Sequence, residues 1–133
     1  MLTFCTYCSH EKDPAPDSLP AAQRYRSRRI QQVQQAATLL SCDFLILSGR
    51  YGLLPPGQPI ENYDYLLQPA EVERLSRKIA EQMLDLDVKR LLFCTRGVAV
   101  DPQLPPYHDC ITLASDLAGV ELIMLQLPED YDE

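Results

Sequence analysis

The sequence has no apolar run long enough to cross a membrane, and no segment with the character of a secretory leader. Its apolar runs, such as Phe44–Leu47 and Leu91–Cys94, are far shorter than the roughly 20 residues that a bilayer requires. The amino terminus lacks the basic residues that begin a signal peptide, and it meets polar residues by Ser9. We therefore expect a cytoplasmic protein that does not associate with a membrane.

Basic residues are scarce and unevenly placed. The 133 residues carry a formal net charge of −7, and the stretch 101–133 holds eight acidic residues and no Lys or Arg. Five arginines fall between Pro20 and Arg50, where Asp43 is the only acid. Affinity for a nucleic-acid backbone depends on neutralised phosphates, so the overall charge argues against binding of duplex DNA. The arginine-rich stretch still allows a local anion site.

The cysteine count of five is odd, and free thiols in a reducing compartment are its simplest explanation. Cys5 and Cys8, followed by His10, have the spacing of a metal knuckle. However, Cys5 lies in an apolar strand pattern, and no second Cys-x-x-Cys pair follows. We expect five reduced thiols, no bound metal and no cofactor.

Hydrophobic periodicity predicts one α/β domain over residues 1–128, followed by an acidic tail over 129–133. Continuous apolar runs predict strands at residues 2–7, 43–48, 88–95 and 120–127. Helical spacing predicts helices over residues 20–40, from about 68 through Met83, and over 107–118. Strands that are apolar throughout are typical of a parallel sheet covered on both faces. We therefore expect a three-layer, Rossmann-like α/β/α fold with a four-stranded, mainly parallel sheet in the order βαβαβαβ.

The long connections all run from a strand to the next helix, over residues 8–19, 49–67 and 96–106. In a parallel sheet these connections emerge at the carboxyl ends of the strands, where open α/β sheets bind their ligands beside helix N-termini. Loops of this length are usually functional. The sequence therefore predicts a binding site at this edge.

Small donors, glycines and guanidinium groups gather in these loops and at the start of the first helix, a set suited to an anionic ligand with flat rings. The candidate ligand-binding residues are Ser9, Lys12, Arg24, Tyr25, Ser48, Gly49, Arg50, Tyr51, Gly52, Tyr63, Thr95, Arg96 and Gly97. Arg50 is the sharpest candidate because it stands between two glycines directly after a buried strand, and such glycines indicate positive φ or close approach. Asp64 is the candidate catalytic acid or base.

Several of these residues have a plainer interpretation. Arg26, Arg28 and Arg29 are too close in sequence to share one helix face, so we expect most of them to be solvated. Tyr63 could simply pin its loop to the core, and Lys12 stands between two acids in a pattern typical of a surface. No nucleophile pairs with His10 or His108, so we expect their placement to be incidental.

The segment Ile46–Tyr63 resembles the signature of the YaaA-type peroxide-stress family, S-[GA]-x-Y-G-[LV]-[LV]-x-P-x-x-x-I-x-x-Y after a buried strand. The positions in register are Ser48, Gly49, Tyr51, Gly52, Leu54, Pro56, Ile60 and Tyr63. The chain is similar over most of its length to a smaller family of uncharacterised bacterial and phage proteins with the same motif. Those proteins begin with a strand, a Cys- or Ser-containing turn, a Lys and an A-x-x-x-Y helix start. The matching residues here are Cys5, Cys8, Ser9, Lys12, Ala21 and Tyr25, with Gly97 after the third strand.

The resemblance implies a shared pocket around Ser48–Tyr63. YaaA-type proteins are linked to protection against oxidative DNA damage, and DNA binding has been proposed for them; they are longer, and their helix-hairpin-helix-like part has no counterpart here. Two main functions stay open. One is a binding or enzyme domain for a nucleotide-like anionic ligand, with glycosidic or phosphate chemistry. The other is a non-catalytic nucleic-acid-associated stress protein that uses Arg24–Arg29 to bind single strands. A third, lesser possibility is a structural module that is joined to a partner through the acidic tail.

Overall fold

The structure of the protein is a computed structural model that describes residues 1–128. The acidic tail expected over residues 129–133 lies outside the described residues. In chain order the elements are β1 (Leu2–Tyr7), β2 (Leu19–Pro20), α1 (Ala21–Arg24), α2 (Arg28–Leu39), β3 (Asp43–Ser48), β4 (Gly52–Leu54), β5 (Pro59–Ile60), the 3-10 turn η1 (Pro69–Glu71), α3 (Val72–Asp85), β6 (Arg90–Thr95), α4 (Pro105–Ala118) and β7 (Glu121–Gln126). Among the described residues, none of the helices has the length and apolarity needed to cross a membrane.

The central sheet has five strands in the spatial order β4-β3-β1-β6-β7. β1 pairs in parallel with β3 and with β6, and β6 pairs in parallel with β7. β4 pairs antiparallel with β3, and β2 and β5 form a separate two-stranded ribbon. The mixed α/β class and the mainly parallel sheet are confirmed, but the predicted number of four strands is wrong. β4 was missed because three residues within a Gly- and Pro-rich segment are too few to show a period.

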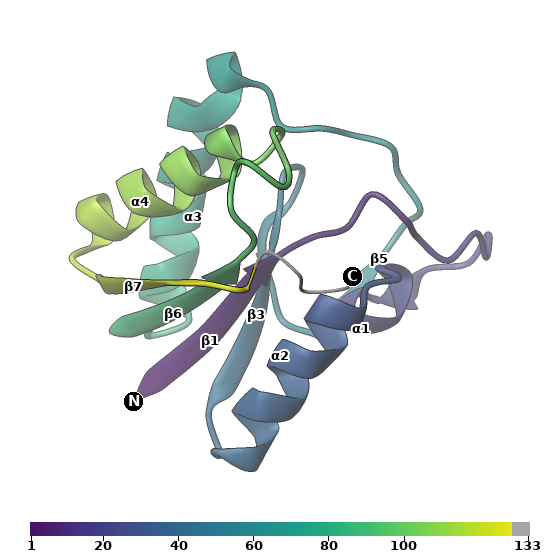
Figure 1. Ribbon diagram of the computed structural model, residues 1–133, viewed down its shortest axis with the longest axis horizontal. Coiled ribbons are helices and arrows are strands. Elements are labelled where there is room, and N and C mark those ends of the chain that lie inside the picture. The colour runs from purple at the N-terminus through teal and green to yellow at the C-terminus, as the bar shows by residue number, and fades with distance from the viewer. Residues whose placement is uncertain (129–133) are drawn as a thin grey trace.

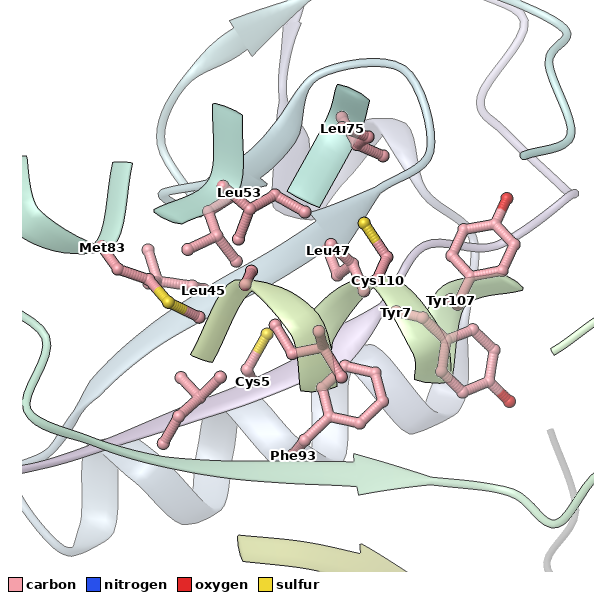
Figure 2. Close-up of a cluster of buried hydrophobic side chains, with 14 of the residues drawn as sticks. Cys5, Tyr7, Leu45, Leu47, Leu53, Leu75, Met83, Phe93, Tyr107 and Cys110 are labelled. Carbon is pink, nitrogen blue, oxygen red and sulfur yellow. The ribbon is translucent and has the colours of Figure 1, made fainter. Parts of the chain in front are cut away.

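Helices cover both faces of the sheet (Figure 1). α2 packs against β1 and β3 on one face, and α3 and α4 pack on the other face and against each other. Because strand side chains alternate between faces, Phe4 joins the cluster under α2, whereas Cys5 and Tyr7 join the cluster under α3 and α4. Figure 2 shows Tyr7 and Tyr107 together at one end of the second cluster, with both hydroxyls directed away from it.

The helix predicted over residues 20–40 is broken, and this correction matters for the site. Tyr25 leaves the helix to form a β-bridge with Lys12 of the first loop. The Arg24 carbonyl accepts a hydrogen bond from the Asp13 N–H at 2.7 Å, which fastens the loop to the break. The Ser27 hydroxyl then caps α2 by accepting from the backbone N–H of its third residue, Ile30. The apolar spacing continues across the break, so periodicity alone could not reveal it.

The three long connections leave from the carboxyl ends of β1, β3 and β6, and the second of them first returns along β3 as the antiparallel strand β4. The return connections are short, as at Gly119, which ends α4 in the left-handed conformation with φ 70°. The longest irregular segments therefore all begin at one edge of the sheet.

Candidate functional site

Two cavities adjoin at the carboxyl edge of the sheet. The first, the tyrosine-lined cavity, measures about 180 Å³, and its lining includes Tyr7, Cys8, Lys12, Asp64, Tyr65 and Tyr107. The second, the arginine-lined cavity, measures about 300 Å³, and its lining includes Cys8, Ser9, Glu11, Arg26, Arg29 and Arg96. Both are also lined by His10 and Asp101. Residues 7–10, directly after β1, thus form a wall common to the two cavities.

Hydrogen bonds fix this wall. The Cys8 N–H donates to the Leu47 carbonyl at 2.8 Å, which extends the pairing of β1 with β3 by one residue. The Ser9 hydroxyl donates to the Glu11 carbonyl at 2.6 Å and closes the turn that follows. The backbone that carries the Cys8 side chain is therefore held by the sheet itself.

Arg29 lies against the wall and is fully buried, whereas Arg26 and Arg28 are exposed, so most of the three arginines are solvated as expected. Its guanidinium donates to the Thr6 hydroxyl and the Tyr7 carbonyl, both at 2.6 Å, and to the Cys8 carbonyl at 3.3 Å. It also lies 3.5 Å from the centroid of the Tyr7 ring. Burial of this charge is compensated by hydrogen bonds and a ring face. Arg29 thus holds the end of β1 and places a positive charge at the arginine-lined cavity.

Arg24, a candidate ligand-binding residue, is also fully buried, but it lines neither cavity. Its guanidinium donates to the carbonyls of Asp13, Ala15, Asp17 and Ile60. These contacts tie the first loop to β5. These hydrogen bonds shape the first loop and hold the Arg24 guanidinium outside the lining of both cavities.

Lys12 lines the tyrosine-lined cavity. Its ammonium lies 4.6 Å from the centroid of the Tyr63 ring and donates to the His10 carbonyl at 3.2 Å. Burial lowers the pKa of Lys12, while electrostatic interaction with Cys8 and Asp64 opposes this change. Asp64, the candidate acid or base, lines the same cavity.

The motif residues Ser48, Tyr25 and Tyr63 form a buried hydrogen-bonded group. The Ser48 hydroxyl accepts from the N–H groups of Arg50 and Tyr51, both at 3.1 Å, and lies 2.9 Å from the Tyr63 hydroxyl. Burial raises the pKa of Tyr25 and of Tyr63, so both stay protonated. None of the three lines either cavity, although the Tyr63 ring supports Lys12. The group therefore meets the site through the contact of the Tyr63 ring with Lys12.

The turn after β3 is positioned by α3. Gly52 adopts φ 78°, as its place in the motif suggests, and a Cβ there would lie 2.3 Å from the Gln82 side-chain oxygen. That oxygen accepts from the Leu53 N–H at 2.8 Å, and the Gln82 amide donates to the Tyr51 carbonyl at 3.1 Å. Gln82 was missed because the sequence gives no sign that a helix residue pairs with this turn.

Arg50 and Gly49 take different places at this turn. Arg50 is exposed, with its guanidinium 5.4 Å and 5.6 Å from the ring centroids of Tyr51 and Tyr63, and it lines neither cavity. Gly49 needs no positive φ, but a Cβ there would lie 2.9 Å from the Tyr107 hydroxyl. Tyr107 therefore approaches the turn closely, and this approach is the physical reason for Gly49.

The third loop supplies Arg96 to the arginine-lined cavity and is held by α4. The Thr95 hydroxyl donates to the Arg96 carbonyl at 2.8 Å and lies 2.7 Å from Nε2 of His108. Because the single Thr95 proton is used, Nε2 of His108 carries the proton in this contact. Burial lowers the pKa of His108, which favours the neutral ring. At Gly97 a Cβ would lie 2.8 Å from the Gln126 side chain, so the glycine permits close packing on β7.

The structure thus brings Ser9, Lys12 and Arg96 together at the cavities, and adds Cys8, Arg29 and Tyr107, which the candidate list lacked. Cys8 and Tyr107 could have been found from their places directly after a strand and at the start of a helix at the same edge. All five cysteines lie within the described residues and are free. Within residues 1–128, no three His, Cys, Asp or Glu side chains are grouped so that they could hold a metal ion.

Comparison of the chain with protein-family models, with curated proteins and with solved structures found no match. The candidate site therefore rests on the residues and the geometry described above.

Proposed function

We propose that the protein binds a small anionic ligand that carries a flat ring, of the nucleotide class, in the two adjoining cavities. The observation that carries this proposal is the common wall at residues 7–10, with arginines lining one side and tyrosines the other. Guanidinium groups suit phosphate oxygens, and tyrosine rings suit a flat ring. The phosphate would lie beside Arg26 and Arg96, and the ring beside Tyr65 and Tyr107.

The sizes of the two cavities suit a ligand that has two parts. Sites for drug-sized molecules occupy about 300–1,000 Å³, so the tyrosine-lined cavity of about 180 Å³ suits one part of such a ligand. The arginine-lined cavity, at about 300 Å³, suits a second part. A ring joined to a charged group matches this division better than a single compact ion does.

The arrangement of the fold supports the same location. We propose a three-layer, Rossmann-like arrangement, in which α2 covers one face of the sheet, α3 and α4 cover the other, and the carboxyl edge is left for the ligand. We also propose that the motif shared with YaaA-type proteins serves to build the floor of this site. The free thiols support the expected reducing, cytoplasmic environment. Should the site be catalytic, Asp64 and Lys12 are the groups placed for proton transfer.

The alternative of a nucleic-acid-associated protein needs an exposed arginine patch over residues 24–29. Burial of Arg24 and Arg29 leaves Arg26 and Arg28 as the exposed arginines of that stretch. Two exposed charges form a small footprint for a phosphate backbone, whereas binding in a cavity needs only a few converging groups. This observation favours the cavity ligand.

Calorimetry with AMP, adenosine and inorganic phosphate tests the proposal. We expect AMP to bind more tightly than either part, and Arg96→Ala to weaken AMP about ten-fold, the effect of losing one charge-assisted hydrogen bond. Arg28→Ala is the matched control, because Arg28 is an exposed arginine of α2 outside the lining of both cavities. Equal losses in the two variants, or no binding of AMP, would refute the proposal. A steep dependence on salt, with binding to oligonucleotides instead, would support the alternative.

A further inference from the structure

The two edge strands of the sheet differ in how their outer sides are covered. β4 is three residues long and buried, and its Leu53 N–H donates to the Gln82 side chain of α3 at 2.8 Å. β7 is six residues long, and within residues 1–128 it has a strand neighbour on one side only, which is β6 (Figure 1). An uncovered edge of this length offers a row of backbone groups to another strand.

The backbone groups on the open side of β7 belong to alternate residues. The N–H groups of Glu121 and Leu127 donate to the carbonyls of the residue before β6 and of its last residue, at 3.0 Å and 2.8 Å. β6 and β7 pair in one continuous register, and successive residues of a strand direct their backbone groups to opposite sides. The N–H and C=O groups of Leu122, Met124 and Gln126 therefore point away from β6. These three residues are spaced symmetrically about Met124.

Apolar side chains are exposed on both faces of β7. Ile123 lies beside Leu92 of β6 on the face where α2 packs over β1 and β3, and Ile123 and Leu125 are 36% and 47% exposed there. Met124 lies on the opposite face and is 42% exposed. Exposed apolar side chains on both faces of an open edge favour its burial against another chain.

The usual protections of an open edge are missing from β7. Natural proteins protect such strands with charged side chains, proline or a bulge. β7 contains no proline and no bulge, and its one charged residue, Glu121, is paired with Arg90 at 2.9 Å. Residues 122–128 carry no charge, in a chain whose net charge is −7. Along this uncharged segment two copies of the chain can meet without opposing like charges.

We propose that β7 pairs with β7 of a second copy of this chain, in antiparallel orientation about a two-fold axis at Met124. Met124 then faces Met124 of the second copy, and Leu122 faces Gln126, so every backbone group on the open side has a partner. Ile123 faces Leu125 of the second copy, which forms an apolar pair on the other face. A two-fold contact needs a surface that is complementary to itself, and β7 has this property. No residue of β7 lines either cavity, so the contact does not depend on the proposed function.

The position of the axis follows from the residues at the two ends of the segment. An axis one residue earlier would place the charged Glu121 opposite the apolar Leu125. An axis one residue later would place Pro128, which has no N–H, opposite Leu122. An axis between two residues would set outward backbone groups against groups that already bond to β6. Met124 is therefore the centre of the register that we propose.

The size of this contact predicts a dimer that dissociates on dilution. A six-residue strand is about 20 Å long, so two paired strands bury less than the roughly 1,200 Å² that marks stable complexes. The other edge of the sheet, β4, is covered by α3, so the assembly stops at two copies.

Sedimentation velocity of the full chain over a range of concentrations tests the dimer. We expect a monomer that becomes a dimer as the concentration rises, and Leu125→Lys to weaken the dimer at least about ten-fold, because it places a charge on the paired edge. Leu39→Lys is the matched control, because Leu39 is an exposed leucine at the end of α2, which packs over β1 and β3. A monomer at every concentration up to about 1 mM, equal effects of the two variants, or an assembly larger than two copies would overturn the proposal.

Disulfide formation tests the register without adding a charge. Residues that face each other in a hydrogen-bonded antiparallel pair have Cα atoms about 5.5 Å apart, which is within the range of a disulfide. Met124→Cys should therefore form an intermolecular disulfide under mild oxidation, whereas the two copies of residue 122 in Leu122→Cys would lie about 13 Å apart. Non-reducing electrophoresis compares both variants with the native chain, whose five thiols give the background. Equal linking in the three chains, or faster linking in Leu122→Cys, would overturn the proposed pairing.

Discussion

The hydroxyl oxygens of Tyr25 and Tyr63 lie 2.5 Å apart, and the Ser48 hydroxyl lies 2.9 Å from that of Tyr63. The direction of these hydrogen bonds follows from Ser48, whose oxygen already accepts from two backbone N–H groups. Ser48 must therefore donate to Tyr63, and Tyr63 must donate to Tyr25. The motif builds a one-way chain of hydroxyls that locks the turn after β3 to the break between α1 and α2.

This direction predicts unequal effects of removing the two hydroxyls. Tyr63→Phe leaves the Ser48 proton and the Tyr25 oxygen without partners, so we expect it to lower the free energy of unfolding by about 2–4 kcal/mol. Tyr25→Phe leaves only the Tyr63 proton without an acceptor, and we expect about 1–2 kcal/mol. Urea unfolding of both variants measures the difference. Equal losses would contradict the assigned direction.

A second prediction concerns Gly52 and Gln82. Gly52→Ala places a methyl group at φ 78° and against the Gln82 oxygen, so we expect a loss of about 2–3 kcal/mol in the free energy of unfolding. Gln82→Ala frees the Leu53 N–H and should cost about 1–2 kcal/mol. Urea unfolding of each single variant measures both losses.

The double variant distinguishes backbone strain at residue 52 from a steric clash with the Gln82 side chain. With the Gln82 side chain shortened, the methyl group added by Gly52→Ala would no longer meet the amide oxygen, so the double variant should be more stable than the sum of the two losses implies. Gly57→Ala is the matched control, because a Cβ there has no neighbour within 4 Å and Gly57 has no positive φ. A strictly additive double variant would show that the backbone conformation alone demands Gly52.

Much of the fold could be predicted because it depends on local patterns. β1 was predicted at its observed bounds, and Leu75, Ile79 and Met83 of the predicted helix stripe are buried on α3. The site was harder, because its geometry comes from contacts across the chain. Nothing local distinguishes Arg29, which is buried, from Arg28, which is exposed. The sequence Gly–Arg–Tyr–Gly made Arg50 the sharpest candidate for ligand binding. The fold leaves Arg50 outside the lining of both cavities and places Cys8 in the lining of both.

We expect protonation of His108 to contribute to the loss of folding stability at acidic pH. Its pKa is lowered chiefly by burial, against the opposing charges of Asp109 and Asp101. The unfolded chain therefore binds the proton first, near the ordinary histidine value of about 6.5. The stability that the neutral ring contributes is present above this pH and is lost as the pH falls toward the lower pKa of the folded state.

His108→Gln tests this contribution, because the glutamine amide can still donate to the Thr95 hydroxyl. We expect the variant to lose less stability than the native chain between about pH 6.5 and pH 5. His10→Gln is the control, since it removes the other histidine of the chain. A native pH dependence that survives in His108→Gln and disappears in His10→Gln would show that the wrong histidine was assigned.

The last prediction concerns alkaline solution, where the buried tyrosines make folding stability fall as the pH rises. Burial raises the pKa of Tyr25, Tyr63 and Tyr107 above the ordinary value of about 10. Their contribution to stability is complete below that pH, and it is lost as the pH rises through the folded-state values, because the unfolded chain releases these protons first. We expect tyrosinate absorbance from these three rings to appear together with unfolding, and Tyr63→Phe to reduce the slope of stability against pH above about pH 10.

The thiols of Cys5, Cys94 and Cys110 act in the same direction, so the comparison is made between Tyr63→Phe and the native chain, in which those thiols are unchanged. Ionisation of all three rings in a chain that is still folded would contradict the buried hydroxyl chain from Ser48 to Tyr25.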